Sequence, residues 1–264
     1  MSISIGKFFV LACCLSSAFA GETVLLQENF ESQTPGMKPE KWLRHTWKRP
    51  ITDRFEITSE DSVSGDNALK FARTDCAFGW QAEIRMKPVP PNTGGRVNFS
   101  FHILLQGQTS STSHRFKIFR SGISTPEFIS IWMNSSGIAV TYHAAKKTIR
   151  FPEISVQPNR WYRFSLSIPL TPEDGKTLQA ELTDTASKKT QKAETEWLSF
   201  SDKNERYHIF WDFMKSMRQA TVFLDDIKFS LMTPETTVIK SGSYQSTHII
   251  PPDISGGPSA EPPV

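Results

Sequence analysis

The chain has 264 residues, 30 of them basic and 27 acidic, which gives a formal net charge of +3 at neutral pH. The two signs are interspersed and form no basic block, so the composition gives no support to a nucleic-acid partner. Aromatic residues make up 11% of the chain and include seven tryptophans, a content that suits a protein that stacks sugar rings on indole faces.

The first 20 residues have the pattern of a secretory signal peptide. Lys7 precedes the apolar run of residues 8–15, and residues 18–20 supply a small-x-small cleavage site. We therefore expect cleavage before Gly21 and a secreted or periplasmic protein. A lipid anchor on Cys13 is the alternative. The apolar run is too short for a permanent membrane anchor, and no later segment approaches the length of a membrane span.

Alternation of apolar and polar residues dominates the part of the chain that follows. Residues 161–168 place one apolar residue at every second position, and residues 80–86 and 96–105 do the same. Further strands are expected near residues 24–30, 51–58, 67–73, 115–120, 127–133, 137–142, 147–151, 177–184, 207–213 and 220–231. Turn signals separate these segments, and no apolar period of 3.6 residues lasts beyond a turn or two. The pattern predicts an all-β domain over residues 21–232, built from two packed antiparallel sheets.

The character of the chain changes after Met232. Residues 233–264 hold six prolines and three glycines among many serines and threonines. A segment of this composition cannot bury enough apolar surface to order itself, so we predict a flexible, disordered C-terminal tail.

Two acidic segments mark the ends of the predicted domain. Glu28-Asn29-Phe30-Glu31 lies in the first strand region, and the last strand carries Asp225 and Asp226, one on each face by alternation. This pair of ends resembles the first and last strands of the concanavalin A-like lectin/glucanase group, which includes carbohydrate-binding modules. The resemblance implies a jelly-roll β-sandwich that binds a polysaccharide or glycan.

The same resemblance implies a structural calcium ion, which in many such modules ties the first strand and an early loop to the last strand. Calcium takes six to eight oxygen ligands. Glu28 or Glu31, the carbonyls of residues 64–66, and Asp225 or Asp226 are the candidate ligands. The alternative is that the buried aspartate accepts hydrogen bonds from backbone amides or meets an arginine.

Polar residues on three predicted strands form a second candidate site. The outward positions of these strands hold Gln81, Glu83, Arg85, Asn98, His102, Arg115 and Lys117. If the three strands neighbour one another, they line a concave surface of the size of an oligosaccharide; the alternative is a solvated outer face. Trp47 and Trp161 are the tryptophans that we expect to be exposed for sugar stacking.

A partial resemblance to alginate-lyase-type jelly rolls leaves open the alternative that the protein is an enzyme. It rests on residues 81–85, on His102 and on residues 240–245, and it implies Arg85, His102 and Tyr244 as catalytic residues for β-elimination. The motif is incomplete, because Gln81 and Val238 replace an expected arginine and tyrosine. No Glu-x-Asp pair of a laminarinase-type glycosidase is present, and the histidine spacing does not support zinc.

These observations predict an exported, non-catalytic β-sandwich that binds a polysaccharide or glycan. A polysaccharide-cleaving enzyme, with an alginate-lyase-like lyase in first place, is the main alternative. A structural protein associated with the cell envelope is the third interpretation.

Overall fold

The computed structural model describes residues 19–46, 54–73, 80–85, 94–106, 113–120, 129–134, 137–198, 207–213 and 220–234. Within these ranges the chain forms fifteen strands and one short 3₁₀ helix, η1 (Pro172–Asp174). The strands are β1 (Phe19–Glu28), β2 (Trp42–Thr46), β3 (Arg54–Thr58), β4 (Ala68–Arg73), β5 (Trp80–Arg85), β6 (Arg96–Gln106), β7 (Ser113–Arg120), β8 (Ile129–Asn134), β9 (Gly137–Tyr142), β10 (Lys147–Arg150), β11 (Trp161–Pro169), β12 (Thr177–Asp184), β13 (Thr190–Glu196), β14 (Tyr207–Phe213) and β15 (Ala220–Pro234).

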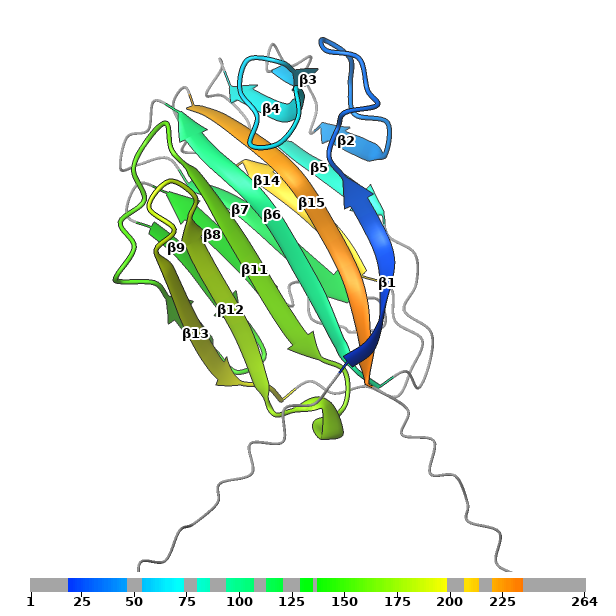
Figure 1. Cartoon of the computed structure of the whole chain (residues 1–264), viewed down its shortest axis with the longest axis vertical. Coiled ribbons are helices and arrows are strands. Elements are labelled where there is room, and N and C mark those ends of the chain that lie inside the picture. The colour runs from blue at the N-terminus through cyan, green and yellow to red at the C-terminus, as the bar shows by residue number, and fades with distance from the viewer. Residues whose placement is uncertain are drawn as a thin grey trace, which may run out of the picture.

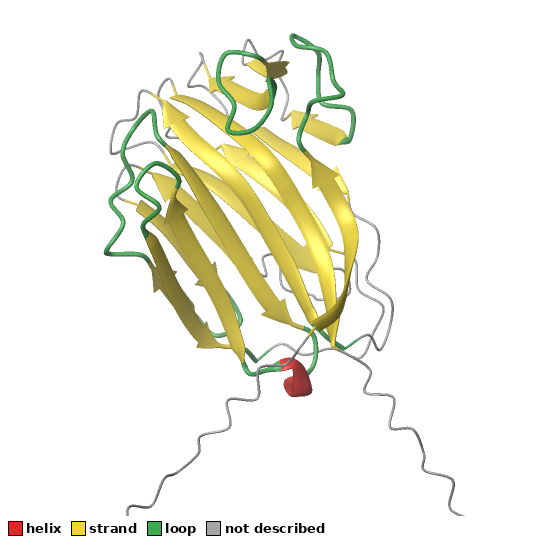
Figure 2. Cartoon of the chain, in the orientation of Figure 1, coloured by secondary structure: helices red, strands yellow, loops and turns green. Residues whose placement is uncertain are grey.

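The strands form two antiparallel sheets that pack face to face (Figure 1; Figure 2). Sheet A has the order β13-β12-β11-β6-β15-β4-β3, and β1 also pairs with β15. Sheet B has the order β10-β9-β8-β7-β14-β5-β2. The predicted all-β jelly-roll sandwich is therefore confirmed. Two strands were not predicted from the sequence, because β13 lacks an apolar stripe and β2 is only five residues long.

The apolar stripes of the strands meet between the two sheets, as alternation predicts. Phe99 and Phe101 of β6 are fully buried and contact Phe116 of β7 in the opposite sheet, with ring centroids 5.6 and 4.6 Å apart. Phe164 of β11 packs beside Phe101 at 5.3 Å. Each such buried side chain contributes about 1.5–3 kcal/mol to folding. This shared core fixes the outward residues of β6 and β11 on the exposed face of sheet A.

The last strand, β15, changes its neighbour halfway along one edge. Residues 220–224 pair with β4, and residues 227–234 pair with β1. The changeover falls at Asp225 and Asp226, where the register with β6 shifts and Asp226 has a φ of 48°. The prediction of one carboxylate on each face is wrong, because the bulge adds a residue and both side chains bond to Ser64.

The predicted signal peptide, Trp47, and residues 235–264 of the predicted tail, with Tyr244, lie outside the described residues, apart from Phe19 and Ala20 at the start of β1. The last strand continues to Pro234, two residues past the predicted domain boundary. In the part of the chain that the structure describes, no helix has the length and apolar character needed to cross a membrane.

Candidate functional site

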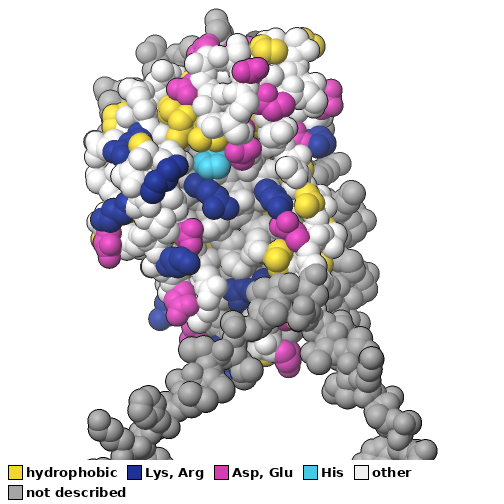
Figure 3. All heavy atoms as spheres, viewed as in Figure 1, with side chains coloured by type: hydrophobic (Ala, Val, Ile, Leu, Met, Phe, Trp, Pro, Cys, Tyr) yellow, Lys and Arg dark blue, Asp and Glu magenta, His cyan; other side chains and the backbone are white. Residues whose placement is uncertain are grey.

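The exposed face of sheet A contains a hollow of about 690 Å³. Strands β1, β6, β11, β12, β13 and β15 all contribute residues to its lining. Figure 3 looks onto this face and shows lysine and arginine side chains gathered around a histidine, with carboxylates among them. A hollow on the outer face of a sheet needs short side chains at its centre and longer ones around them.

The strand register supplies that arrangement. Ser165 of β11 lies opposite Ser100 of β6, and Ser167 lies opposite Asn98, which faces Ser230 of β15. These short polar side chains form the floor of the hollow. Their hydroxyl and amide groups each carry hydrogen-bond donors and acceptors. The floor is therefore able to bond with hydroxyl groups of a ligand without placing charge beneath it.

Longer charged side chains stand on both sides of the serine floor. Lys192 of β13 lies 3.3 Å from Glu181 of β12, and Lys228 of β15 donates to Glu22 of β1 at 2.6 Å. The hydrogen bond from Lys228 lowers the pKa of the Glu22 carboxyl. The two ion pairs leave the sides of the hollow polar and nearly neutral.

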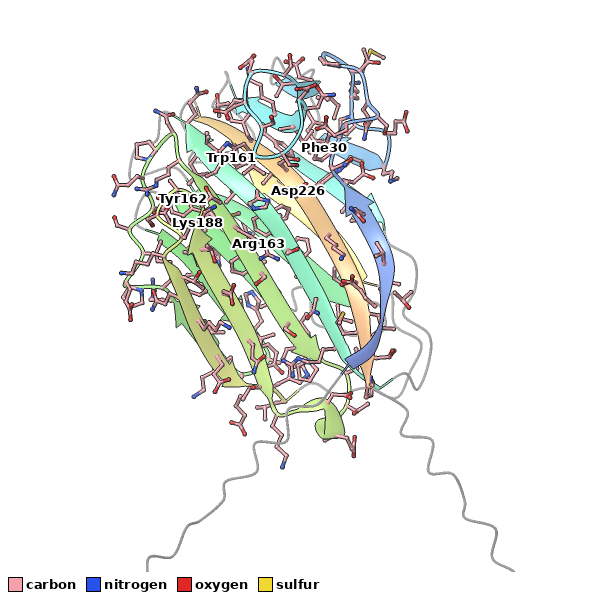
Figure 4. The ribbon with its side chains drawn as sticks, viewed as in Figure 1. Phe30, Trp161, Tyr162, Arg163, Lys188 and Asp226 are labelled. Carbon is pink, nitrogen blue, oxygen red and sulfur yellow. The ribbon has the colours of Figure 1, made fainter. Side chains whose placement is uncertain are left out.

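At the end of the hollow near the β3–β4 loop, the lining residue Arg163 is followed by a different group of residues that lies just beyond the hollow. Arg163 lies opposite His102 in the pairing of β11 with β6. The Nδ1 atom of His102 lies 3.3 Å from Oδ2 of Asp226, in a contact that lacks hydrogen-bond geometry. Burial lowers the pKa of His102 against the opposing charge of Asp226, and Arg163 and Lys188 lower it further. Figure 4 shows Trp161, Arg163, Lys188 and Asp226 at this same end.

The indole ring of Trp161 has a fixed orientation at this end. Its Nε1 donates to Oδ1 of Asp61 at 2.9 Å, and the side chain remains partly exposed. Asp61 belongs to the loop that joins β3 to β4, residues 59–67, which we call the capping loop. The predicted exposure of Trp161 thus agrees with the structure in part.

The capping loop is held by carboxylates from the segment after the first strand and from the last strand, β15. Oδ2 of Asp225 accepts hydrogen bonds from the backbone N–H of Val63 and Ser64 at 3.0 and 3.2 Å. Oδ1 of Asp226 accepts from the Ser64 hydroxyl at 2.9 Å. Glu31 accepts from two further N–H groups, those of residues 66 and 67. Asp225 is fully buried, and burial raises the pKa of its carboxyl to about 6 against the effect of these donors.

The predicted calcium ligands therefore gather at the capping loop, except for Glu28. The carboxylate of Glu28 instead pairs with Lys41 and accepts from Gln33 at 3.0 Å. Among the described residues, no group of three or more His, Cys, Asp or Glu side chains is placed as metal ligands. N–H donors already occupy oxygens of Glu31 and Asp225, so an ion would have to displace them. Calcium stays a prediction.

The predicted ligand-binding residues do not form one surface. Asn98, His102 and Trp161 lie on sheet A, whereas Gln81, Glu83 and Arg85 belong to β5, and Arg115 and Lys117 to β7, both in sheet B. The condition for a shared concave surface, that these three strands neighbour one another, is therefore not met. Strands β5, β6 and β7 alternate between the sheets, and polar alternation looks the same in either sheet. On sheet B, Arg115 lies over the ring of Trp132 at 4.7 Å, and Lys117 is buried.

The three residues that the lyase resemblance implied are also separated. Arg85 lies in sheet B and His102 in sheet A, so the core of the sandwich lies between their strands. Tyr244 lies outside the described residues. The structure thus does not assemble that set on the described part of the chain.

The lining of the hollow includes residues that the sequence reasoning did not select. They are Glu22, Arg163, Gln179, Glu181, Lys192, Glu194 and Lys228. A signal for Arg163 was present, because it shares one face of its strand with Trp161 and two serines. Lys228 and Glu22 become neighbours only through the pairing of the first strand with the last, which no local pattern shows.

Comparisons with known proteins extend the description of the fold. No protein-family model and no curated protein matches the chain. Among solved structures, the chain resembles the marine PL-14 alginate lyase of Aplysia kurodai, with a TM-score of 0.52 and 10% identity over 70% of this chain and 90% of that one.

Two further solved structures have a similar fold. The CBM2 module of Lactobacillus casei BL23 phage J-1 evolved Dit has a TM-score of 0.53 and 10% identity over 80% of this chain and 96% of the module. The lectin UEA-II in complex with galactose has a TM-score of 0.50 and 7% identity over 81% of this chain and all of the lectin. At such identities the likeness concerns the fold alone. The chain has the jelly-roll sandwich fold of the concanavalin A-like lectins.

Proposed function

We propose that the protein is an exported, non-catalytic carbohydrate-binding protein and that the hollow on sheet A binds the glycan. The observation that carries the proposal is the serine floor between two ion pairs, with the oriented indole of Trp161 two positions beyond the lining residue Arg163 on the same face of β11. Sugars combine hydroxyl groups with apolar C–H faces, so they require both kinds of contact. The hollow offers the two side by side.

The chemistry of the site suits a preformed binding surface. Trp161 presents part of its ring to solvent, while its N–H is already bonded to Asp61. A ring held in this way loses little conformational freedom when a ligand stacks on it, which favours affinity. The floor serines lie on central strands of sheet A, so their positions are equally fixed.

The structural likeness to a lectin and to a CBM2 module supports a carbohydrate ligand at the level of the fold. The likeness to an alginate lyase, together with His102 beside Asp226 on the same face, supports the alternative of a polysaccharide-cleaving enzyme. The separation of Arg85 from His102 favours the binding function over that lyase.

Binding can be measured by affinity electrophoresis in gels that contain a panel of soluble polysaccharides. We expect retention on at least one polysaccharide, and we expect Trp161→Ala to weaken it about tenfold or more, because loss of a stacking aromatic at a binding hot spot costs above 1 kcal/mol. Trp132→Ala is the matched control, since it removes a partly exposed tryptophan from sheet B.

Three outcomes decide between the interpretations. Equal weakening by both tryptophan variants would place binding elsewhere than the hollow. Release of an unsaturated product that absorbs ultraviolet light, lost in His102→Ala, would replace the binding function with a lyase. Failure to retain or cleave any polysaccharide would favour the structural, envelope-associated interpretation.

The proposed export rests on the pattern of residues 1–20 and has its own test. We expect the protein recovered from the secreted or periplasmic fraction to begin at Gly21, because residues 18–20 provide the cleavage site. Mass spectrometry of the intact exported protein measures this directly. A mass that shows an acylated Cys13 would contradict the prediction and assign a membrane-anchored location.

A further inference from the structure

We propose that the glycan bound in the hollow carries an anionic substituent, a carboxylate or a sulfate, and that Arg163 binds it. This inference rests on the carbohydrate-binding function proposed above and names the class of glycan.

The charges that line the hollow are only partly paired with one another. The lining holds three basic side chains, Arg163, Lys192 and Lys228. Lys192 and Lys228 are neutralised by Glu181 and Glu22. Arg163 is exposed, and its guanidinium group makes no hydrogen bond or ion pair within the described residues. It is therefore the lining cation whose charge is left for a ligand.

The neighbours of Arg163 include carboxylates and a second cation. Two carboxylates lie near this end, and neither forms an ion pair with Arg163 within the described residues: Asp226 accepts from the Ser64 hydroxyl and contacts His102, and Asp61 accepts from the indole N–H of Trp161. Lys188, in the turn between β12 and β13, is exposed, and its charge acts on His102 together with that of Arg163. This end thus presents two exposed cations, Arg163 and Lys188, whose side chains form no ion pair within the described residues.

Arg163 lies within reach of a sugar that stacks on Trp161. Trp161, Arg163 and Ser165 occupy alternate positions of β11 and so lie on one face, with about 7 Å between successive side chains. One sugar residue stacked on Trp161 is able to reach Arg163 with a substituent while its neighbour in the glycan lies over the serine floor. A guanidinium group presents parallel N–H donors that match the oxygens of a carboxylate or sulfate better than an ammonium does.

At the other end of the hollow, Glu194 is exposed and lies beside Gln179 in the strand register. Its negative charge disfavours a second anionic group there. The charged substituent is thus directed to the end formed by Arg163 and Lys188.

The test compares polygalacturonate, its fully methyl-esterified form, a sulfated galactan and a neutral galactan in affinity gels at low salt. We expect the wild-type protein to bind an anionic glycan at least tenfold more tightly than its uncharged counterpart. Arg163→Ala should remove that preference, and Arg163→Lys should keep only part of it, because it retains the charge without the fork of donors. Arg150→Ala, at an exposed position of β10 in sheet B, is the matched control and should change binding less than twofold.

The arms separate the sources of the anionic group and the two levels of the proposal. Preference for polygalacturonate assigns a carboxylate, and preference for the sulfated galactan assigns a sulfate. Binding of neutral glycans with equal strength, unchanged in Arg163→Ala, overturns this inference and leaves the proposed function intact. Binding to no glycan, in these gels or in the wider panel, overturns both. Since Arg163 is exposed, an unchanged melting temperature of Arg163→Ala shows that the variant is folded.

Discussion

Replacement of Asp225 by asparagine is expected to destabilise the protein by an amount that grows as the pH falls from about 7.5 to about 4. The carboxyl of Asp225 is fully buried and accepts N–H groups from Val63, Ser64 and Asp226. Asparagine offers one acceptor and one donor in its place, so at least one of these N–H groups loses its partner. An unsatisfied buried group costs about 1–3 kcal/mol at any pH.

The pH dependence follows from the direction of the pKa shift. Burial raises the pKa of Asp225 to about 6 in the folded protein, above its ordinary value of 3.8. Between these two values the folded protein holds a proton that the unfolded chain has released, so stability decreases as the pH rises through the window. At neutral pH the ionised carboxylate carries the full penalty. This free-energy cost of burying the ionised carboxylate is relieved below about pH 4. It amounts to at most about 3 kcal/mol, because the pKa of Asp225 lies about two units above its ordinary value.

Urea unfolding of the wild type and the variant at a series of pH values measures this difference. The contributions of other titrating groups cancel in the comparison. Asp66→Asn is the control, because it removes an exposed carboxyl from the same capping loop. A wild-type advantage over Asp225→Asn that stays constant across the series would show that the buried carboxyl does not take up a proton in the folded state.

The fold could be predicted from the sequence because burial of one face imposes an apolar period of two residues on every central strand. The apolar positions 162, 164, 166 and 168 of β11 are buried as alternation predicts. The same rule fails for β13, whose seven residues include a single apolar one, Ala193, because an edge strand with a solvated face needs no apolar stripe.

The site was harder to predict from the sequence than the fold. Alternation tells which residues share a face of a strand, but it does not tell which sheet holds the strand. His102 and Arg115 have the same outward pattern and lie on opposite sides of the sandwich. Arg163 meets His102 only through the pairing of β11 with β6, about 60 residues apart in the chain. The gathering of Glu31, Asp225 and Asp226 at the capping loop followed from the resemblance, whereas their N–H partners follow from the bulge in β15.

The second large effect is expected for Gly95→Ala, at the residue that precedes β6. Gly95 has a φ of +119°, which residues with a Cβ atom rarely adopt. A Cβ atom on Gly95 would lie 2.0 Å from the carbonyl oxygen of Met232 in β15, so backbone has to move. The next residue, Arg96, is buried and donates to the carbonyls of Ser167 in β11, Asp174 in η1 and Thr177 in β12, which holds the start of β6 beside these elements.

We expect Gly95→Ala to lower the free energy of unfolding by about 3–5 kcal/mol, the sum of backbone strain and overpacking. Gly137→Ala separates the two causes. Gly137 has a φ of +132°, but no atom lies within 4 Å of the position that a Cβ would take there, so only the strain of about 1–2 kcal/mol applies. Thermal unfolding of both variants measures the difference, at roughly 2–4 °C per kcal/mol for a domain of this size. Equal losses of unfolding free energy in the two variants would contradict the prediction, because they would mean that β6 and β15 move apart at this end without cost. The close approach of the two strands would then not help to hold the floor of the hollow in place.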